Sequence, residues 1–324
     1  MSRGPRPHHG PTETGMDHPT PQDVRRGGIG YATTMILSGT IGLVVVAADQ
    51  PSINVVFFRC VIASAILGAF CLATRRFTPD FFTRGPLIAT FVAGTALVAN
   101  WVLLFESYRH VPIGIATVVF HLKPFILLLY GQLLLGDRIT WPKLFWMTTG
   151  FLGFLAIARL DRIDGGLAGD GYLLGIGLAL GAALLQPIST VAILKSLKPF
   201  SPYVIALGQF VLGILFLAPL LETGDLPVTA VQWGCLAILG IVHTVVMYSL
   251  MYMSLPRIRT ALIAILQFLY PVTALVVDYV VFDTVLDLHQ ALGVAAIMLA
   301  ILGTSLNWTP AALFRRAAHH QKKA

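Results

Sequence analysis

Lys123 is the residue whose type and position most clearly suggest chemistry. It follows Pro112 by eleven residues inside an apolar run, which is about 16 Å along a helix that rises ~1.5 Å per residue. A cation that far from the end of an apolar run is costly unless it meets a partner, and no acidic residue lies at its depth. This setting favours binding of the carboxylate of a small molecule. Alternatively, Lys123 reaches a backbone carbonyl or water and only tunes a cavity.

His121 competes with Lys123 for the same cavity face. Two residues on a helix point about 200° apart, so only one of them faces a cavity fully unless Pro124 distorts the helix. His121 is in line with Thr117 and Pro124, and this polar strip favours His121 as the lining residue. The alternative is a histidine that is hydrogen-bonded within the protein interior.

Further candidates are polar, aromatic or thioether side chains in the middle of other apolar runs. A Trp at mid-depth is unusual, because membrane proteins place Trp at the interfaces, so Trp101 is a candidate stacking wall for an apolar group. The others are Asn100, Gln186, His243, Met247, Tyr248, Gln267 and Ser38. Core packing is the alternative for Trp101 and for the stripe of His243, Met247 and Tyr248. Gln186 and Gln267 could instead bond a backbone carbonyl that a neighbouring proline frees.

Two more sets of residues concern structure and movement. Arg59 lies eight residues into its apolar run, and we expect it to form a structural ion pair with Glu106; direct contact with a ligand is the alternative. Prolines inside the runs each remove a backbone donor and bend a helix, which makes them candidates for kinks and gates. These prolines are Pro124, Pro187 and Pro271.

The composition requires a membrane around these residues. Of 324 residues, 56% are hydrophobic and only 11% are charged, and the mean hydropathy is +0.79. Soluble domains carry about 25% charged residues, so a soluble enzyme, a nucleic-acid binder and a disordered protein are excluded. The histidines and cysteines lack metal-ligand spacing, and we expect no metal and no cofactor.

Ten apolar runs of about 20 residues predict ten transmembrane helices. They cover residues 28–47, 51–73, 86–108, 113–135, 142–160, 170–194, 200–221, 229–253, 258–282 and 287–307. The predicted fold is an all-α membrane protein. We divide it into a disordered cytoplasmic tail (1–26), a first five-helix repeat (27–160), a second repeat (168–307) and a basic cytoplasmic tail (308–324).

The positive charges predict the orientation. With the N-terminus inside, 17 of the 22 Lys and Arg residues fall in cytoplasmic segments, and only Arg109, Arg159 and Arg162 fall outside. Both termini are therefore expected in the cytoplasm, and the protein in the cytoplasmic (inner) membrane.

The two halves share three marks in the same order: a Tyr-x-x-x-Pro motif, a mid-span proline and an acidic residue. They fall at Tyr108–Pro112, Pro124 and Asp137 in the first half and at Tyr252–Pro256, Pro271 and Asp283 in the second. Five spans per half is an odd number, so the halves should lie in opposite orientation. Such inverted repeats are typical of secondary transporters, which bind substrate at the midplane between the halves.

At this point the chain resembles the drug/metabolite transporter superfamily, in its EamA-type ten-helix branch. The resemblance rests on the 5+5 arrangement, on Leu37-Ser38-Gly39-Thr40-Ile41-Gly42, on Asn54-Val55-Val56-Phe57-Phe58-Arg59 and on Asp137 ahead of the fifth span. More narrowly it is similar to YddG-type bacterial amino-acid exporters. The resemblance implies a basket of ten helices around a cavity formed chiefly by spans 1, 3, 4, 6, 8 and 9, with spans 5 and 10 set apart. It also implies efflux of neutral and aromatic amino acids.

The expected function is therefore secondary export of amino acids by alternating access. Mid-span acids for a proton relay are lacking, which favours facilitated downhill export, although a titrating His121 would change that. A carrier of another metabolite or drug, including proton-coupled efflux, stays open, and an intramembrane enzyme is disfavoured because no nucleophile–base motif occurs. We expect a small-molecule substrate, no nucleic-acid partner and a monomer.

Overall fold

The computed structural model describes residues 20–135, 140–158, 170–193, 195, 200–254, 257–258, 262–263, 266–306 and 308–309. Within these ranges the regular structure is entirely helical and contains no strand, which confirms the all-α prediction. Most of the two expected tails and Asp137 lie outside the described residues.

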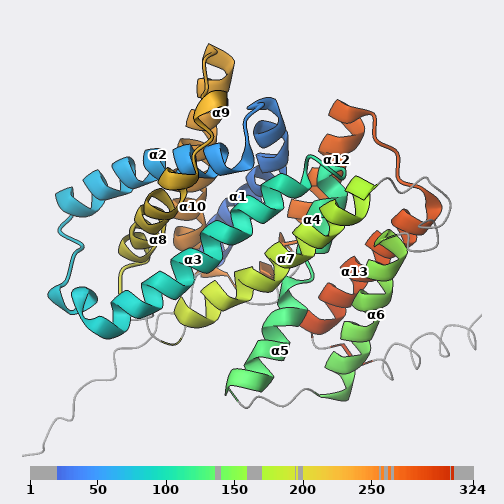
Figure 1. Cartoon of the computed structure of the whole chain (residues 1–324). Helices are drawn as coiled ribbons and strands as arrows, with labels where there is room; N and C mark the ends of the chain where they lie inside the picture. Colours follow the sequence, from blue (N-terminus) through green and yellow to red (C-terminus); the bar gives the residue numbers. More distant parts are fainter. Residues whose placement is uncertain are drawn as a thin grey trace, which may run out of the picture.

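Helices occupy the described parts of all ten predicted runs (Figure 1). The first half contains α1 (Pro21–Ala47), α2 (Ser52–Ala73), a short 3-10 helix η1 (Pro79–Phe82), α3 (Arg84–Ser107), α4 (Ile113–Phe120), α5 (Lys123–Leu135) and α6 (Trp141–Ala158). The second contains α7 (Asp170–Ala192), α8 (Pro202–Leu217), the short 3-10 helices η4 (Ala218–Leu220) and η5 (Thr223–Asp225), α9 (Ala230–Gly240), a π-helical segment η6 (Ile241–Val246), α10 (Met247–Ser254), α12 (Leu269–Phe282) and α13 (Leu288–Ser305).

Eight of the described helical stretches are long and apolar enough to cross a membrane. The fourth comprises α4 and the start of α5, and the seventh comprises α9, η6 and α10. The other two predicted runs are occupied by α6 and by α12, which is a shorter apolar helix of 14 residues. The protein is therefore an integral, multi-pass membrane protein.

The fourth span is interrupted in its middle, at His121 and Leu122. Pro124 explains this position, because it cannot donate a hydrogen bond to the carbonyl four residues earlier. The backbone N–H of His121 is shared between Thr117 and Val118, and Leu122 donates to Val119 at 3.0 Å, so the chain tightens before α5 begins. This interruption lies close to the centre of the predicted span.

The other two mid-span prolines behave differently from Pro124. Pro271 lies in the first turn of α12, where a missing N–H is tolerated. Pro187 lies inside α7, which continues past it to Ala192. The π-helical segment η6 is a distortion that the sequence did not predict. There Thr244 Oγ1 donates to the carbonyl of Leu239, five residues earlier, at 2.8 Å.

Each half packs its third and fourth spans against the first span of the other half. From the first half, α3 and α4 pack on α7; from the second half, α10 and α12 pack on α1. The pairs α2–α8, α4–α12 and α6–α13 each join equivalent spans. Gly30, near the start of α1, lies beside Ser254, whereas Gly175, near the start of α7, lies beside Val111 at the opposite end of the bundle. The two halves therefore run in opposite directions.

The pair α6 and α13 lies apart from the helices around the centre (Figure 1). Their contact depends on glycine: a Cβ on Gly153 would lie 2.7 Å from the carbonyl oxygen of Gly293, and a Cβ on Gly303 would collide with the ring of Trp146. Small residues at such positions let transmembrane backbones approach closely. The pair braces the side of the bundle while the other spans enclose a cavity.

Candidate functional site

A central cavity of about 330 Å³ lies between the two halves. Residues from α1, α2, α3, α4, α5, α7, α8, α10 and α12 line it, whereas none of its lining residues in the described part of the chain comes from α6 or α13. Its volume is near the lower end of the ~300–1,000 Å³ typical of small-molecule sites. Most of the predicted binding residues line this cavity: Lys123, His121, Trp101, Gln186, Met247, Tyr248, Gln267 and Ser38, together with Pro124 and Arg59.

The cavity is basic. Lys123 and Arg59 line it, and no Asp or Glu belongs to the wall that the described residues form. The Lys123 ammonium lies 4.1 Å from the centre of the Phe120 ring and 6.0 Å from that of Tyr270. Cation–π contacts stabilise such a charge only in part, so it remains available to an anionic ligand.

His121 and Lys123 both line the cavity, because the helix is interrupted between them. An unbroken helix would have pointed them apart, as the sequence predicted. His121 Nδ1 lies 2.7 Å from the carbonyl oxygen of Thr117, which assigns the proton to that nitrogen if the ring is neutral. The ring also meets Tyr270 edge-on, with centres 4.8 Å apart.

The expected ion pair between Arg59 and Glu106 does not form. Arg59 is 1% exposed; its Nε donates to Thr244 Oγ1 at 2.6 Å and its Nη2 donates to the carbonyl of His243 at 2.9 Å. Glu106 instead accepts from Ser52 at 2.7 Å and lies 3.9 Å from Arg109. The pairing prediction failed because η6, which is far away in sequence, supplies the partners of Arg59.

An aromatic wall lies beside Arg59. The Arg59 guanidinium lies 3.9 Å from the centre of the Trp101 ring, which in turn lies 5.6 Å from Phe210. Phe210 meets Tyr248 edge-on. The wall combines α3, α8 and α10, and it can hold an apolar or aromatic group.

Polar side chains are distributed around the rest of the wall. Gln186 Oε1 accepts from Asn100 Nδ2 at 2.7 Å, and Gln267 Nε2 lies 3.2 Å from the Tyr31 hydroxyl. Ser38 donates to the carbonyl of Thr34 and lies 3.2 Å from Met247 Sδ. These contacts hold the polar groups in place around the cavity.

Two predicted binding residues do not reach the cavity wall. Asn100 is fully buried behind Gln186, which it orients. His243 lies behind Arg59, and its ring nitrogen Nε2 is 3.0 Å from Thr40 Oγ1. Both therefore support lining residues and do not line the cavity themselves.

The sequence also missed lining residues. Tyr31, Ser189, Gln209 and Tyr270 were not singled out. For Tyr31 a signal existed, since Tyr31, Thr34 and Ser38 share one helix face at spacings of three and four residues. Gln209 and Ser189, which are hydrogen-bonded at 3.2 Å, come from different helices and carry no comparable pattern.

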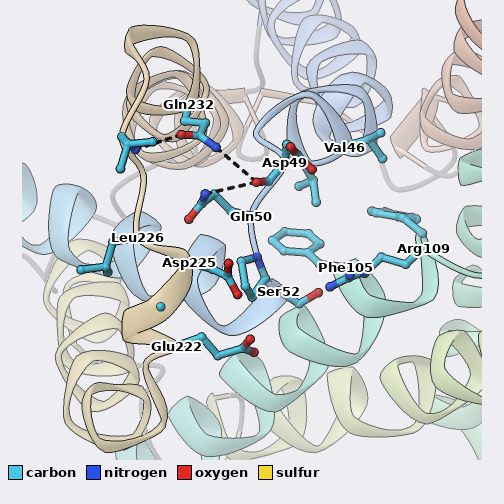
Figure 2. A pocket seen from close by; sticks show the side chains of 15 residues that line it. Val46, Asp49, Gln50, Ser52, Phe105, Arg109, Glu222, Asp225, Leu226 and Gln232 are labelled. Carbon is cyan, nitrogen blue, oxygen red and sulfur yellow. Dashed lines mark hydrogen bonds between the residues drawn. The ribbon is translucent and has the colours of Figure 1, made fainter.

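A second, larger pocket of about 570 Å³ opens at one end of the bundle, near Asp49 (Figure 2). Its rim carries Asp49, Glu222 and Asp225, and Figure 2 shows Gln50 and Gln232 bonded to the carbonyl of Asp49. We place the candidate site in the smaller central cavity, because Lys123 and Arg59 line it and none of its described lining residues is acidic, whereas the larger pocket carries three acidic residues. The two pockets share one residue, Phe105, which is 2% exposed.

Asp278 ties the two halves together near the same end. Its carboxylate accepts the backbone N–H of Ile113 at 3.1 Å and that of Gly114, so it caps the start of α4 from α12. A Cβ at Gly114 would lie 2.9 Å from Asp278 Oδ2 and 2.5 Å from Leu275. Glycine at position 114 is thus needed for this close contact.

Comparison with known proteins decides the family. The model of the EamA-like transporter family matches residues 26–159 and again residues 173–306. The chain belongs to the EamA-like transporter family. The two matches confirm the duplication, and the family belongs to the drug/metabolite transporter superfamily that the sequence resembled.

Similar proteins are transporters. An uncharacterized transporter, YxxF of Bacillus subtilis, is 31% identical over 82% of this chain and 84% of its own length. The pseudopaline exporter CntI of Pseudomonas aeruginosa is 24% identical over 60% of this chain and 66% of its own. A probable terminal-alkyne amino-acid exporter of Streptantibioticus cattleyicolor is 27% identical over 66% and 72%. One solved crystal structure shares the fold, with a TM-score of 0.59, 18% identity and coverage of 86% of this chain and 96% of its own.

Proposed function

We propose that this EamA-family transporter exports amino acids and related metabolites, with neutral and aromatic amino acids as its expected substrates. The observation that carries the proposal is a basic cavity, bounded by both halves, that is lined by Lys123 and by the aromatic side chains of Trp101 and Tyr248. The α-carboxylate binds near Lys123 and His121, and the side chain packs among Trp101, Tyr248 and Met247.

Transport follows alternating access between the two halves. The interruption at His121–Leu122 and the start of α12 are the places where the crossing spans change direction, and they lie beside the cavity. The two halves rock about this crossing. Phe105 and the contact between Asp278 and the start of α4 close one end of the cavity and must give way for release.

The excess of Lys and Arg in one set of loops favours an orientation in the inner membrane that leaves both termini in the cytoplasm. Substrate then enters from the cytoplasm and leaves past Phe105 at the Asp49 end. Export is facilitated and downhill, because the described cavity wall presents no carboxylate to carry a proton. We propose that the protein acts as a monomer and without catalysis.

A second candidate is export of another small metabolite. Two relatives favour it, since one is a pseudopaline exporter and the other is a probable terminal-alkyne amino-acid exporter.

Counterflow in proteoliposomes tests the proposal. Vesicles that contain the purified full-length protein are loaded with an unlabelled amino acid and mixed with a trace of the labelled compound. We expect transient accumulation for phenylalanine, tyrosine or leucine and none in protein-free vesicles. If no amino acid in a complete panel accumulates, the amino-acid proposal is wrong.

A further inference from the structure

Arg59 is a second cation in the central cavity, and it too lacks an acidic partner among the residues that the structure describes. Its Nε and Nη2 are held by Thr244 and by the carbonyl of His243. Its third nitrogen, Nη1, makes no hydrogen bond to the part of the chain that the structure describes. Since Arg59 lines the cavity, this nitrogen is a donor that a ligand can use.

The surroundings of Arg59 fix its position but do not neutralise its charge. A hydroxyl, a backbone carbonyl and the face of Trp101 hold the guanidinium, and all three are uncharged. With Lys123 the cavity carries two positive charges and no acidic lining residue among those described. Such charges are costly in a low-dielectric interior, so a bound anion stabilises the site strongly.

A neutral amino acid balances this charge incompletely. Its single carboxylate neutralises one cation, while its ammonium adds another positive charge to the cavity. The amide oxygens of Gln209 and Gln267 can accept hydrogen bonds from the ammonium, because each side chain uses only its amide nitrogen for a contact within the protein. One of the two cations still has no anion.

We propose that the cavity has two anion subsites, one at Lys123 and one at Arg59, and that compounds with a second carboxylate bind more tightly than their neutral counterparts. The inference rests on the proposed function, because it takes this cavity as the substrate site. The preferred ligands are dicarboxylic amino acids and related dicarboxylates, whose carbon chain lies along the wall of Trp101 and Tyr248.

Pairs of ligands that differ only in one carboxylate test the proposal. Glutamate and glutamine have nearly the same shape, as do succinate and its monoamide. In counterflow with the wild-type protein, we expect the acid of each pair to compete for the site with about tenfold or greater advantage over the amide. Equal or weaker competition by both acids overturns the inference.

Two variants at position 59 assign the second subsite. Arg59→Gln should reduce the glutamate-to-glutamine preference to near one, and Arg59→Lys, which keeps the charge, should retain part of the preference. Lys143→Gln in α6, outside the cavity, is the matched control and should leave the ratio unchanged. A full preference in Arg59→Gln removes Arg59 from the site.

The outcomes separate this inference from the proposed function. If glutamine and phenylalanine are transported but neither acid is favoured, the exporter proposal stands and the second subsite is wrong. If no amino acid is transported but succinate stabilises the protein against heat more than its monoamide does, the two subsites stand and the amino-acid proposal is wrong. The heat measurement also applies if Arg59→Gln does not fold, because it needs only the wild-type protein.

Discussion

At the scale of single residues, the site depends on cations that have no acidic partner in the described part of the chain. Most buried charges in membrane proteins are paired, and unpaired ones mark functional sites. Lys123 and Arg59 are both of this kind, and they come from different helices, α5 and α2. A carboxylate that reaches either one replaces the missing partner.

Lys123→Met should lower counterflow of a neutral amino acid at least tenfold, because a charge-assisted hydrogen bond is worth roughly 1.5–3 kcal/mol. Methionine keeps the length and apolar stem of lysine, so packing changes little. Lys143→Met serves as the control for a lysine in a helix outside the cavity. Unchanged transport by Lys123→Met would remove this residue from the site.

The depth of a residue along one helix can be counted from the sequence. It singled out Lys123, Gln186 and Gln267, and all three line the cavity; their role in binding substrate stays a prediction. Arg59 was given the wrong partner, and Tyr270 was missed. Those contacts join residues more than a hundred positions apart, and no local pattern specifies them.

At the scale of elements, the interruption of the fourth span sets the geometry of the site. Helical repetition separates His121 from Lys123, and the break before Pro124 brings both to the cavity. The sequence located this distortion, because proline has a known effect on the preceding turn. It did not predict η6, since a π-helical turn arises from tertiary packing and has no comparable residue signal.

Pro124→Ala should restore the missing backbone donor and allow a more continuous helix. We expect a higher melting temperature together with slower counterflow, because the two cavity residues would turn apart. Pro187→Ala is the matched comparison, since α7 already continues past its proline and less change in transport is expected. Equal transport by Pro124→Ala and the wild type would show that the interruption is not needed.

At the scale of the whole molecule, the reciprocal packing of helices between the two halves reflects the duplication. The family model matches each half separately, and equivalent pairs of helices pack in each half. The three repeated marks in the sequence indicated this duplication. They did not fix which helices touch, since loose apolar motifs carry no contact information.

Orientation can be checked with cysteines at opposite ends of the bundle. Val228 is 85% exposed beside the pocket of Figure 2, and Arg76 is exposed after the end of α2. In a background without the three native cysteines, an impermeant maleimide should label Val228→Cys in intact cells and Arg76→Cys only after the cells are opened. The reverse pattern would invert the proposed direction of transport.

Phe105 forms part of the wall of both pockets, so the barrier between them is in places only one side chain thick. The Phe105 ring must therefore stay in place to prevent leakage between the two pockets. Phe105→Ala should therefore join the two chambers and let small ions leak through, which would appear as a current across planar bilayers that does not saturate with solute. If the bilayers stay electrically silent while transport is normal, a second layer of side chains seals the exit.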